Sequence, residues 1–349
     1  MLGFLLAGAV GDAVGAPIEF LSIAQIRARY GPDGLRDYAP LPSGLGEVTD
    51  DTQMTLFTLE GLIKAHLRAR TSGVEAAVPA FLTNAYLRWL DTQLSDAAAN
   101  PDHPGWLVAT PGLHSRRAPG HTCLSALAAI RGGSMPGSVD IPINNSKGCG
   151  GVMRAAPAGL WVGQPEHGFR CGAQACTITH GHPSGYLSGG TLAVIVHQLL
   201  DGTALPAAIE TARTELACWE GHEEQLCALD AAVALAGQGR PTPEKIAEHL
   251  GGGWVGEEAL AIAVCAALTA RDLVDGLRLA VNHSGDSDST GSIAGNILGT
   301  RHGVHAIPMP WLEQLELHDT ITTLAQDAIA EFGPNPPTHT TWSTRYAGN

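Results

Sequence analysis

The sequence contains few aromatic residues and no long apolar run. Phe, Trp and Tyr together make up 5% of its 349 residues, and runs of β-branched residues are short. No apolar run reaches the roughly 18 residues that a membrane-spanning helix needs. Ala and Gly are abundant instead, and this composition favours closely packed helices over a β-sheet. We therefore expect an all-α protein without a membrane-spanning segment.

Positive charge is also scarce. The chain has 20 Lys and Arg residues against 34 Asp and Glu residues, which gives a formal net charge of −14. This balance disfavours direct binding to a nucleic-acid backbone or to an anionic membrane. An anionic ligand would need a metal ion or local backbone dipoles in order to bind.

Cysteine pairs and domain boundaries are absent as well. The seven cysteines are odd in number and include no C-x-x-C pair, which favours reduced, mostly buried thiols and a cytoplasmic location. The apolar N-terminal stretch lacks a basic n-region and soon reaches Asp12 and Glu19, so we do not interpret it as a signal peptide. No linker or repeat marks a second domain. We expect one domain over residues 1–332 and a poorly ordered tail, rich in Pro and Thr, over residues 333–349.

Two oxygen-rich clusters each stand at the start of a predicted helix. The first runs Thr-Asp-Asp-Thr over residues 49–52, and the second runs Asp-Ser-Asp-Ser-Thr over residues 286–290. These residue types are common helix N-caps, but a cap needs only one of them, and the helix dipole offsets the repulsion between neighbouring aspartates only in part. Carboxylates together with hydroxyls suit a hard cation such as Mg²⁺. We interpret the clusters as two halves of one metal site.

Glycines recur every four residues in the helix predicted after the second cluster. They are Gly291, Gly295 and Gly299. Residues four apart lie on one side of a helix, and glycine has no side chain to hold a neighbour away. The spacing predicts a face where another backbone approaches closely.

Three further segments carry candidate ligand contacts. A Gly-rich turn at residues 146–151 precedes a predicted helix containing Arg154, and backbone N–H groups there could bind an anion; a tight structural corner is an equal alternative. His180 and His182 would bind zinc only with further nitrogen or sulfur ligands, so a hydrogen bond to a ligand is the better interpretation. Trp254 follows three glycines and is either a core anchor or a surface for stacking.

Five segments together resemble the ADP-ribosylglycohydrolase family. They are GDAVGAPIEF, TDDTQMTL, NNSKGCGGVMRAAPAGL, THGHPSGYLSGG and NHSGDSDSTGSIAGNILG, and the resemblance spans residues 3–330 in the expected order. The family includes ADP-ribosylarginine hydrolases and the enzyme that reactivates dinitrogenase reductase. The resemblance implies a single compact orthogonal helical bundle with two Mg²⁺ ions, or Mn²⁺ ions, in a cleft.

The resemblance also implies roles for individual residues. The implied metal ligands are Thr49, Asp50, Asp51, Asp286, Asp288 and Ser289. Glu19 matches a carboxylate that some members place beside the metals, and either Glu19 or Asp286 could be the general base. The implied ADP-ribose contacts are Ser146, Gly148, Gly150, His180 and Trp254.

The implied reaction is hydrolysis of the N- or O-glycosidic bond at C1″ of the distal ribose, through an oxocarbenium-like transition state. The sequence GDSDST at residues 285–290 favours an ADP-ribosyl-arginine protein as substrate, while serine, nucleobase and acetyl-ester linkages stay open. The alternatives are another Mg²⁺-dependent hydrolase, such as a phosphoesterase, or a protein that binds ADP-ribose without turnover. We expect a monomer with no membrane or nucleic-acid partner.

Overall fold

The structure, a computed structural model, describes residues 2–42, 44–74, 77–94, 105–161 and 163–346. Over these residues it contains sixteen α-helices, short 3-10 helices and no β-strand, as the composition predicts. The first eight α-helices are α1 (Leu2–Gly15), α2 (Ile23–Tyr30), α3 (Asp50–Ser72), α4 (Val78–Thr92), α5 (His121–Arg131), α6 (Pro165–Thr177), α7 (Pro183–Leu200) and α8 (Leu205–Leu216). The others are α9 (Glu223–Gly237), α10 (Pro243–Leu250), α11 (Gly256–Thr269), α12 (Leu273–Val281), α13 (Ser287–His302), α14 (Met309–Gln314), α15 (His318–Glu331) and α16 (Thr340–Arg345).

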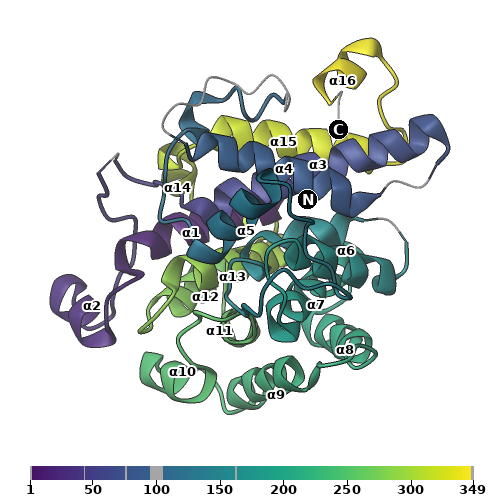
Figure 1. Ribbon diagram of the computed structural model, residues 1–349. Helices are drawn as coiled ribbons and strands as arrows, with labels where there is room; N and C mark the ends of the chain where they lie inside the picture. Colours follow the sequence, from purple (N-terminus) through teal and green to yellow (C-terminus); the bar gives the residue numbers. More distant parts are fainter. Residues whose placement is uncertain (1, 43, 75–76, 95–104, 162, 347–349) are drawn as a thin grey trace.

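Helices α1 and α13 form the centre of the molecule, although they lie at opposite ends of the sequence (Figure 1). Glycines on both helices let the two backbones touch. A Cβ atom on Gly11 would lie 2.0 Å from the carbonyl oxygen of Gly291, and one on Gly295 would lie 2.1 Å from that of Ala7. The predicted close approach at the glycine face of residues 291–299 is therefore confirmed.

The remaining helices surround this central pair. Helices α3, α4 and α15 lie above it in the view of Figure 1, and α8, α9 and α10 lie below. Helix α7 lies fully within the protein over residues 184–196, because its small residues allow neighbours on all sides. This arrangement places the starts of α3 and α13 near one another.

Helices lie near both ends of the chain. Helix α1 runs without a break from Leu2 to Gly15, and its glycines Gly3, Gly11 and Gly15 lie against the backbone of α13 or of the residues next to it. The tail beyond residue 332 is not wholly without order. It forms α16, which buries Trp342 and Tyr346, and the Trp342 indole N–H donates to Glu331 at 2.8 Å.

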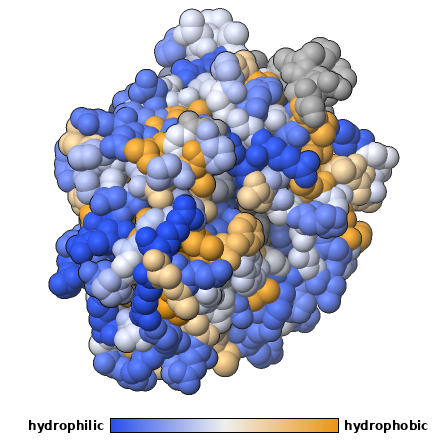
Figure 2. All heavy atoms as spheres, turned by 90° about the vertical axis from the view of Figure 1, so that its left-hand side faces the viewer, coloured by the Kyte–Doolittle hydropathy of each residue, from blue (hydrophilic) through white to orange (hydrophobic). Residues whose placement is uncertain are grey.

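The described residues contain no single helix long and apolar enough to cross a membrane. Only α1 together with α2, which meet at a bend of 93°, passes the length and composition criteria as a pair. Nearly all of α1 is buried inside the protein. The face drawn in Figure 2 is mainly hydrophilic, with small and separate hydrophobic patches.

Candidate functional site

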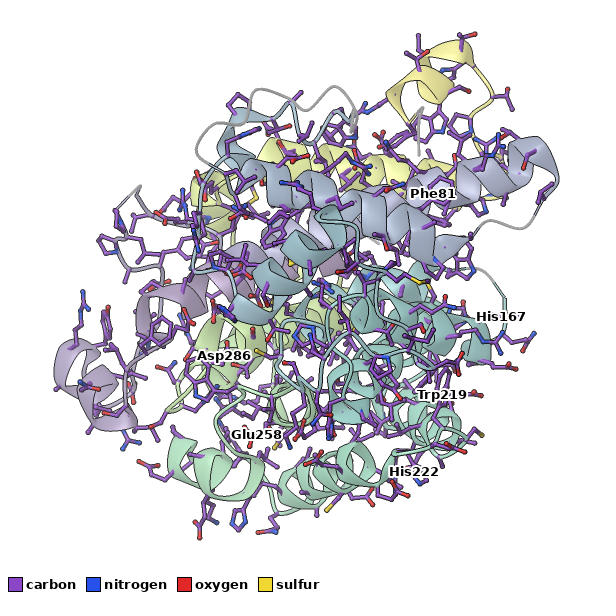
Figure 3. The ribbon with its side chains drawn as sticks, in the orientation of Figure 1. Phe81, His167, Trp219, His222, Glu258 and Asp286 are labelled. Carbon is purple, nitrogen blue, oxygen red and sulfur yellow. The ribbon has the colours of Figure 1, made fainter. Side chains whose placement is uncertain are left out.

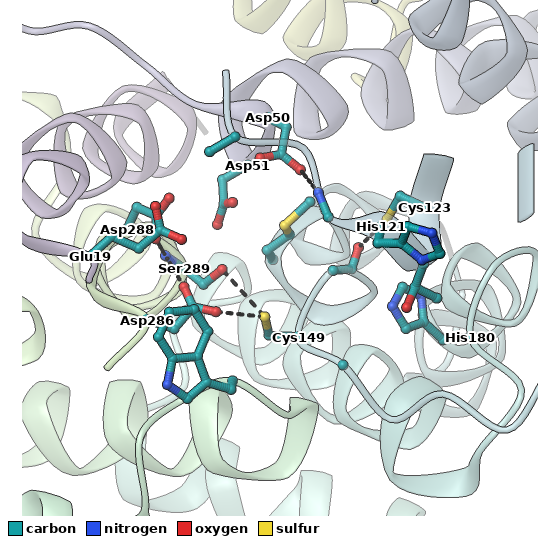
Figure 4. Close-up of a pocket in the computed structure, with 17 residues that line it drawn as sticks. Glu19, Asp50, Asp51, His121, Cys123, Cys149, His180, Asp286, Asp288 and Ser289 are labelled. Atoms are coloured by element: carbon teal, nitrogen blue, oxygen red, sulfur yellow. Dashed lines mark hydrogen bonds between the residues drawn. The ribbon is translucent and has the colours of Figure 1, made fainter. Parts of the chain in front are cut away.

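One cavity of about 240 Å³ collects most of the candidate residues. Five carboxylates from three separate segments line it: Glu19, Asp50, Asp51, Asp286 and Asp288. They gather at one end of the cavity, and His121 and His180 lie at the other end (Figure 4). The two oxygen-rich clusters of the sequence therefore meet across more than two hundred residues.

A buried carboxylate on α1 fixes the start of α3. Asp12 is fully buried and accepts hydrogen bonds from the backbone N–H groups of Thr49 and Thr52, at 3.0 and 3.1 Å, and from the Thr52 hydroxyl. Thr49 is the N-cap of α3, and its hydroxyl accepts from the Asp51 N–H. Asp12 thus holds the turn that presents Asp50 and Asp51, since unpaired N–H groups at a helix start need acceptors.

The α13 side of the cavity is held by a second turn. Asp286 is the N-cap of α13 and accepts from the Ser289 N–H, while its own N–H donates to Gly252 at 2.8 Å. Glu258 accepts from the N–H groups of Gly252 and Gly253 and lies near Asp286 (Figure 3). A Cβ atom on Gly285 would lie 1.9 Å from the Gly252 oxygen, so this turn requires glycine.

The charges of the five carboxylates are not balanced by the protein. Among the described residues, no lysine or arginine forms an ion pair with any of them. Burial, and then the neighbouring Asp288, raise the pKa of Glu19 to about 10. The same two causes raise the pKa of Asp12 to about 7 and raise the pKa values of Asp50 and Asp51. Like charges crowded in a buried site resist ionisation.

This carboxylate end fits a divalent cation. Oxygen atoms of Glu19, Asp286 and Asp288 all lie within 4.8 Å of one another. The buried Oδ1 atom of Asp51 has no hydrogen-bond partner in the described structure, although buried oxygens are normally paired. Ser289 lines the cavity beside them, whereas Thr49 lies behind the lining and acts as the cap of α3. An all-oxygen donor set of this kind suits Mg²⁺ or Mn²⁺.

The opposite end of the cavity is formed by the Gly-rich turn and α5. Gly148 and Gly150 line it together with His121, Thr122 and His180. Ser146 does not line the cavity; its hydroxyl contacts that of Thr122 at 3.1 Å and accepts from the Gly148 N–H. The turn itself is fixed by hydrogen bonds to the segment around Trp254, from the Cys149 N–H to the Trp254 oxygen and from the Gly256 N–H to the Lys147 oxygen.

One prediction about this turn is wrong. The residues after it do not begin an α-helix but form a 3-10 turn at Val152–Arg154, because Pro157 lies only a few residues on and a second 3-10 turn follows at Ala156–Leu160. No α-helix dipole is therefore directed at the cavity from this segment. Arg154, expected on that helix, is fully buried instead.

Trp254 is not a core residue. It is 44% exposed and stacks on Phe20, which is 72% exposed, with ring centroids 5.6 Å apart. Trp254 also lines the cavity at its carboxylate end, beside Glu19 and Asp286. The interpretation of Trp254 as a core anchor is therefore wrong, and stacking against a ligand stays a prediction. His182, by contrast, caps α7 by accepting from the Ser184 N–H.

Sequence reasoning missed two polar residues of the site. Asp12 was recognisable as a lone carboxylate in an apolar helix, a pattern that signals a buried, paired group. Cys149 lies within the Gly-rich turn, and its thiol donates to Asp286 Oδ2 at 2.8 Å and lies 3.8 Å from the Ser289 hydroxyl. The sequence around Cys149 does not predict that contact, because Asp286 lies 137 residues further along the chain.

Comparisons with known proteins found a family match and several relatives. A model of the ADP-ribosylglycohydrolase family matches residues 1–337. The chain is 26% identical to the ADP-ribosyl-[dinitrogen reductase] glycohydrolase of Rhodospirillum rubrum, over 90% of each chain. It is 25% identical to the ADP-ribosylarginine hydrolase Tri1 of Serratia proteamaculans, over 93% of this chain and 77% of the relative.

A solved structure shares the fold. The chain superposes on an ADP-ribosylglycohydrolase-related protein complex with a TM-score of 0.67, at 25% identity, over 95% of this chain and 96% of the other. The family match covers nearly the whole chain, including every residue that lines the cavity. The protein is thus a member of the ADP-ribosylglycohydrolase family, whose enzymes hydrolyse glycosidic bonds of ADP-ribose.

Proposed function

We propose that this protein is a Mg²⁺-dependent hydrolase that releases ADP-ribose from ADP-ribosyl-arginine on a protein. The observation that carries the proposal is the cavity with five unbalanced carboxylates at one end and a Gly-rich turn with His180 at the other. A cavity of about 240 Å³ suits part of a nucleotide-sized ligand and leaves the rest at its mouth. The relative named for arginine linkages supports that choice of substrate.

The residues that would hold the cations are Asp50, Asp51, Asp286 and Asp288, with Ser289 beside them and Thr49 orienting Asp51. When bound, two Mg²⁺ or Mn²⁺ ions would neutralise the carboxylates, bind sugar hydroxyls and make water more acidic. Asp51 contributes an oxygen with no competing protein partner. Asp286 and Asp288 lie two residues apart at the start of α13, and their carboxylate oxygens lie within 4.8 Å of each other.

Glu19 is the better candidate for the general base. Both oxygens of Asp286 are already engaged, Oδ1 by the Ser289 N–H and Oδ2 by the Cys149 thiol. The carboxylate of Glu19 accepts no hydrogen bond from the described residues and lines the cavity. A group that takes a proton from water needs a free oxygen within reach and must be ionised. Glu19 meets the first condition, and bound cations would meet the second, because positive charge nearby favours the ionised carboxylate.

The transition state places positive charge on the ribose ring. Carboxylates at the same end of the cavity favour that charge, and the aromatic face of Trp254 lies beside them. His180 and the amides of the Gly-rich turn, at the opposite end, would bind the remainder of the ADP-ribose. Holding sugar and water together in one cavity lowers the entropic barrier by several kcal/mol.

The test compares three substrates in parallel: ADP-ribosyl-arginine, ADP-ribosyl-serine and free ADP-ribose, each with Mg²⁺ and with chelator. The proposal expects ADP-ribose release from the arginine conjugate in Mg²⁺ alone. Release from the serine conjugate only would move the substrate to an O-linked class. AMP or phosphate released from free ADP-ribose would indicate a phosphoesterase, and affinity without release would indicate a binding protein.

The expected partner is an ADP-ribosylated protein, and the expected compartment is the cytoplasm, where the seven unpaired cysteines stay reduced. A monomer is part of the same proposal. Light scattering on the purified protein measures its oligomeric state, and a dimer would correct it.

A further inference from the structure

Arg154 is a fully buried cation. No Asp or Glu among the described residues forms an ion pair with it. Its guanidinium lies 4.1 Å from the centre of the Tyr86 ring and donates to the sulfur atoms of Met54 and Cys123 at 3.4 Å. Burying an unpaired charge is costly, so the contacts that Arg154 does make warrant a functional explanation.

The strongest of those contacts leads toward the cavity. One Arg154 nitrogen donates to the Ala175 oxygen at 3.1 Å and to the Thr179 hydroxyl oxygen at 2.6 Å. The Thr179 oxygen lies 2.8 Å from Nδ1 of His180. Arg154 itself does not line the cavity, whereas His180 does. The three side chains form a chain of hydrogen bonds that ends at the ligand site.

Arg154 determines which group donates and which accepts in each of these hydrogen bonds. A guanidinium can only donate, so the Thr179 oxygen accepts from Arg154 and has a single proton of its own to place. The Thr179 hydroxyl also lies within hydrogen-bond reach of the Cys123 sulfur. That sulfur already accepts from Arg154, so the imidazole nitrogen of His180 is the better acceptor for the Thr179 proton. If the Thr179 proton is directed at Nδ1 of His180, the ring proton of neutral His180 resides on Nε2. The reverse tautomer would require the Thr179 oxygen to accept from both Arg154 and His180 and to place its own proton elsewhere.

Nε2 of His180 lies on the edge of the ring that faces Gly148 and Gly150, at the end of the cavity opposite the carboxylates. A Cβ atom on Gly148 would lie 3.5 Å from Nε2, and one on Gly150 would lie 3.2 Å from the neighbouring Cε1, so these two glycines leave the ring edge uncovered. Nε2 has no hydrogen-bond partner among the described residues. Burial and the nearby Arg154 lower the pKa of His180 to about 3, which keeps the ring neutral.

We propose that Arg154 and Thr179 are positioning residues that fix His180 as the Nε2–H tautomer, so that it donates a hydrogen bond to an oxygen acceptor of bound ADP-ribose. The proposal rests on the proposed function for the identity of the ligand. Without the relay, a neutral histidine could equally present a bare Nε2 lone pair, which repels phosphate oxygens and can only accept a hydrogen bond from a hydroxyl. The buried charge thus gives a strongly acidic protein a directed donor rather than a second ionic site.

The first experiment needs no ligand. Long-range ¹⁵N–¹H spectra of the histidine-labelled protein report the tautomer of His180, with the signal assigned by comparison with His180→Gln. We expect the Nε2–H form in the wild type and in Thr179→Ser, which keeps the hydroxyl. Thr179→Val removes the hydroxyl at nearly constant volume and should lose the preference. An Nδ1–H tautomer in the wild type would overturn the relay.

The second experiment measures ADP-ribose affinity by calorimetry in Mg²⁺. Thr179→Val should weaken binding about tenfold, the scale for a hydrogen bond to a charged group. Thr177→Val is the matched control, because Thr177 is also buried but its hydroxyl bonds only to the Gln174 oxygen. Equal affinity in the Thr179→Ser and Thr179→Val variants would refute the role of the relay in binding. If the wild type has the expected tautomer and binds no ADP-ribose, the proposed function fails and the relay stands.

The Arg154→Met variant tests independently whether the hydrogen bond from Arg154 to Thr179 sets the tautomer of His180. Methionine fills similar space next to Met54 and Cys123 but cannot donate to Thr179. The Thr179 hydroxyl is then free to rotate, and the tautomer preference of His180 should relax toward a mixture. An unchanged preference in folded Arg154→Met would remove Arg154 from the proposal, and the Thr179 variants test the rest if this variant does not fold.

Discussion

Replacing Asp288 by asparagine tests the cation site most directly. Asp288 is 3% exposed, and its Oδ1 atom accepts from the Ser289 N–H at 3.0 Å. Asparagine keeps the side-chain volume and this oxygen but removes the charge. The cap of α13 is Asp286 rather than Asp288, so the substitution leaves the helix start intact. Any large effect must therefore come from the lost charge.

The size of that effect follows from the spacing of the carboxylates. Oxygen atoms of Asp288, Glu19 and Asp286 lie within 4.8 Å of one another. Two unit charges at that separation would repel by about 3 kcal/mol at an effective dielectric constant of about 20. This is the upper limit in the metal-free protein, because the raised pKa values of Glu19 and Asp286 favour their neutral forms. In chelator, the neutral asparagine should relieve this repulsion and raise the melting temperature. In Mg²⁺, it should weaken cation binding and so reduce the stabilisation that the cation gives.

Turnover should fall at the same time. Substitutions that merely orient metal ligands cost about 10–100-fold, so loss of a charged ligand should cost at least about a hundredfold. The assay is the initial rate of ADP-ribose release from ADP-ribosyl-arginine at saturating Mg²⁺, with melting curves in Mg²⁺ and in chelator. Asp51→Asn should behave alike, and the double variant should lose little more than either single one because both act through one site.

Asp272→Asn is the matched control. Asp272 caps α12 by accepting from the Asp275 N–H at 2.8 Å, is exposed, and does not line the cavity. Asparagine caps helices about as well as aspartate, so neither turnover nor the response to Mg²⁺ should change. Wild-type turnover in Asp288→Asn, with no gain of melting temperature in chelator, would refute the cation site.

The other predictions concern the cation, the pH, the aromatic pair and the central helices. Excess EDTA should abolish hydrolysis and lower the melting temperature at pH 8, and activity that persists in EDTA would contradict the proposed cofactor. The raised pKa values of Asp12, to about 7, and of Glu19, to about 10, mean that the folded metal-free protein binds protons more tightly than the unfolded chain. Stability of the metal-free protein should thus fall as the pH rises through 7, and Mg²⁺ should raise the melting temperature more at pH 8 than at pH 6; an equal gain at both values would contradict this reasoning. Trp254→Ala should weaken ADP-ribose binding by about 1–3 kcal/mol with little change in stability, since the ring is 44% exposed; calorimetry beside a melting curve separates the two, and unchanged affinity excludes stacking. Gly11→Ala should destabilise the fold by at least about 2 kcal/mol, because its Cβ would lie 2.0 Å from a backbone oxygen. Gly237→Ala, at a helical glycine with nothing within 4 Å, should be neutral or slightly stabilising in the same denaturant titration.

Several features of this protein follow from the sequence alone. The aspartate and hydroxyl clusters at residues 49–52 and 286–290 each combine a helix start with more oxygens than a cap uses, and that local surplus predicts the acidic cavity; cation binding there stays a prediction. The four-residue glycine repeat predicts a close helix contact because the helical period places these glycines on one face. The five segments that resemble the family predict the helical fold, because they occur in the expected order over nearly the whole chain.

Other features depend on contacts between distant residues, and only the tertiary structure decided them. Glu19 as the free carboxylate and Asp286 as the engaged one differ because the Cys149 thiol reaches Asp286 from another segment. Asp12 caps a helix that begins 38 residues later, and no local pattern encodes that pairing. Arg154 was expected on an α-helix after the Gly-rich turn, but it lies in a 3-10 turn and is buried against Tyr86 and Thr179. A sequence records which groups are present, while burial and the partners brought by folding determine their charge, their proton positions and their roles.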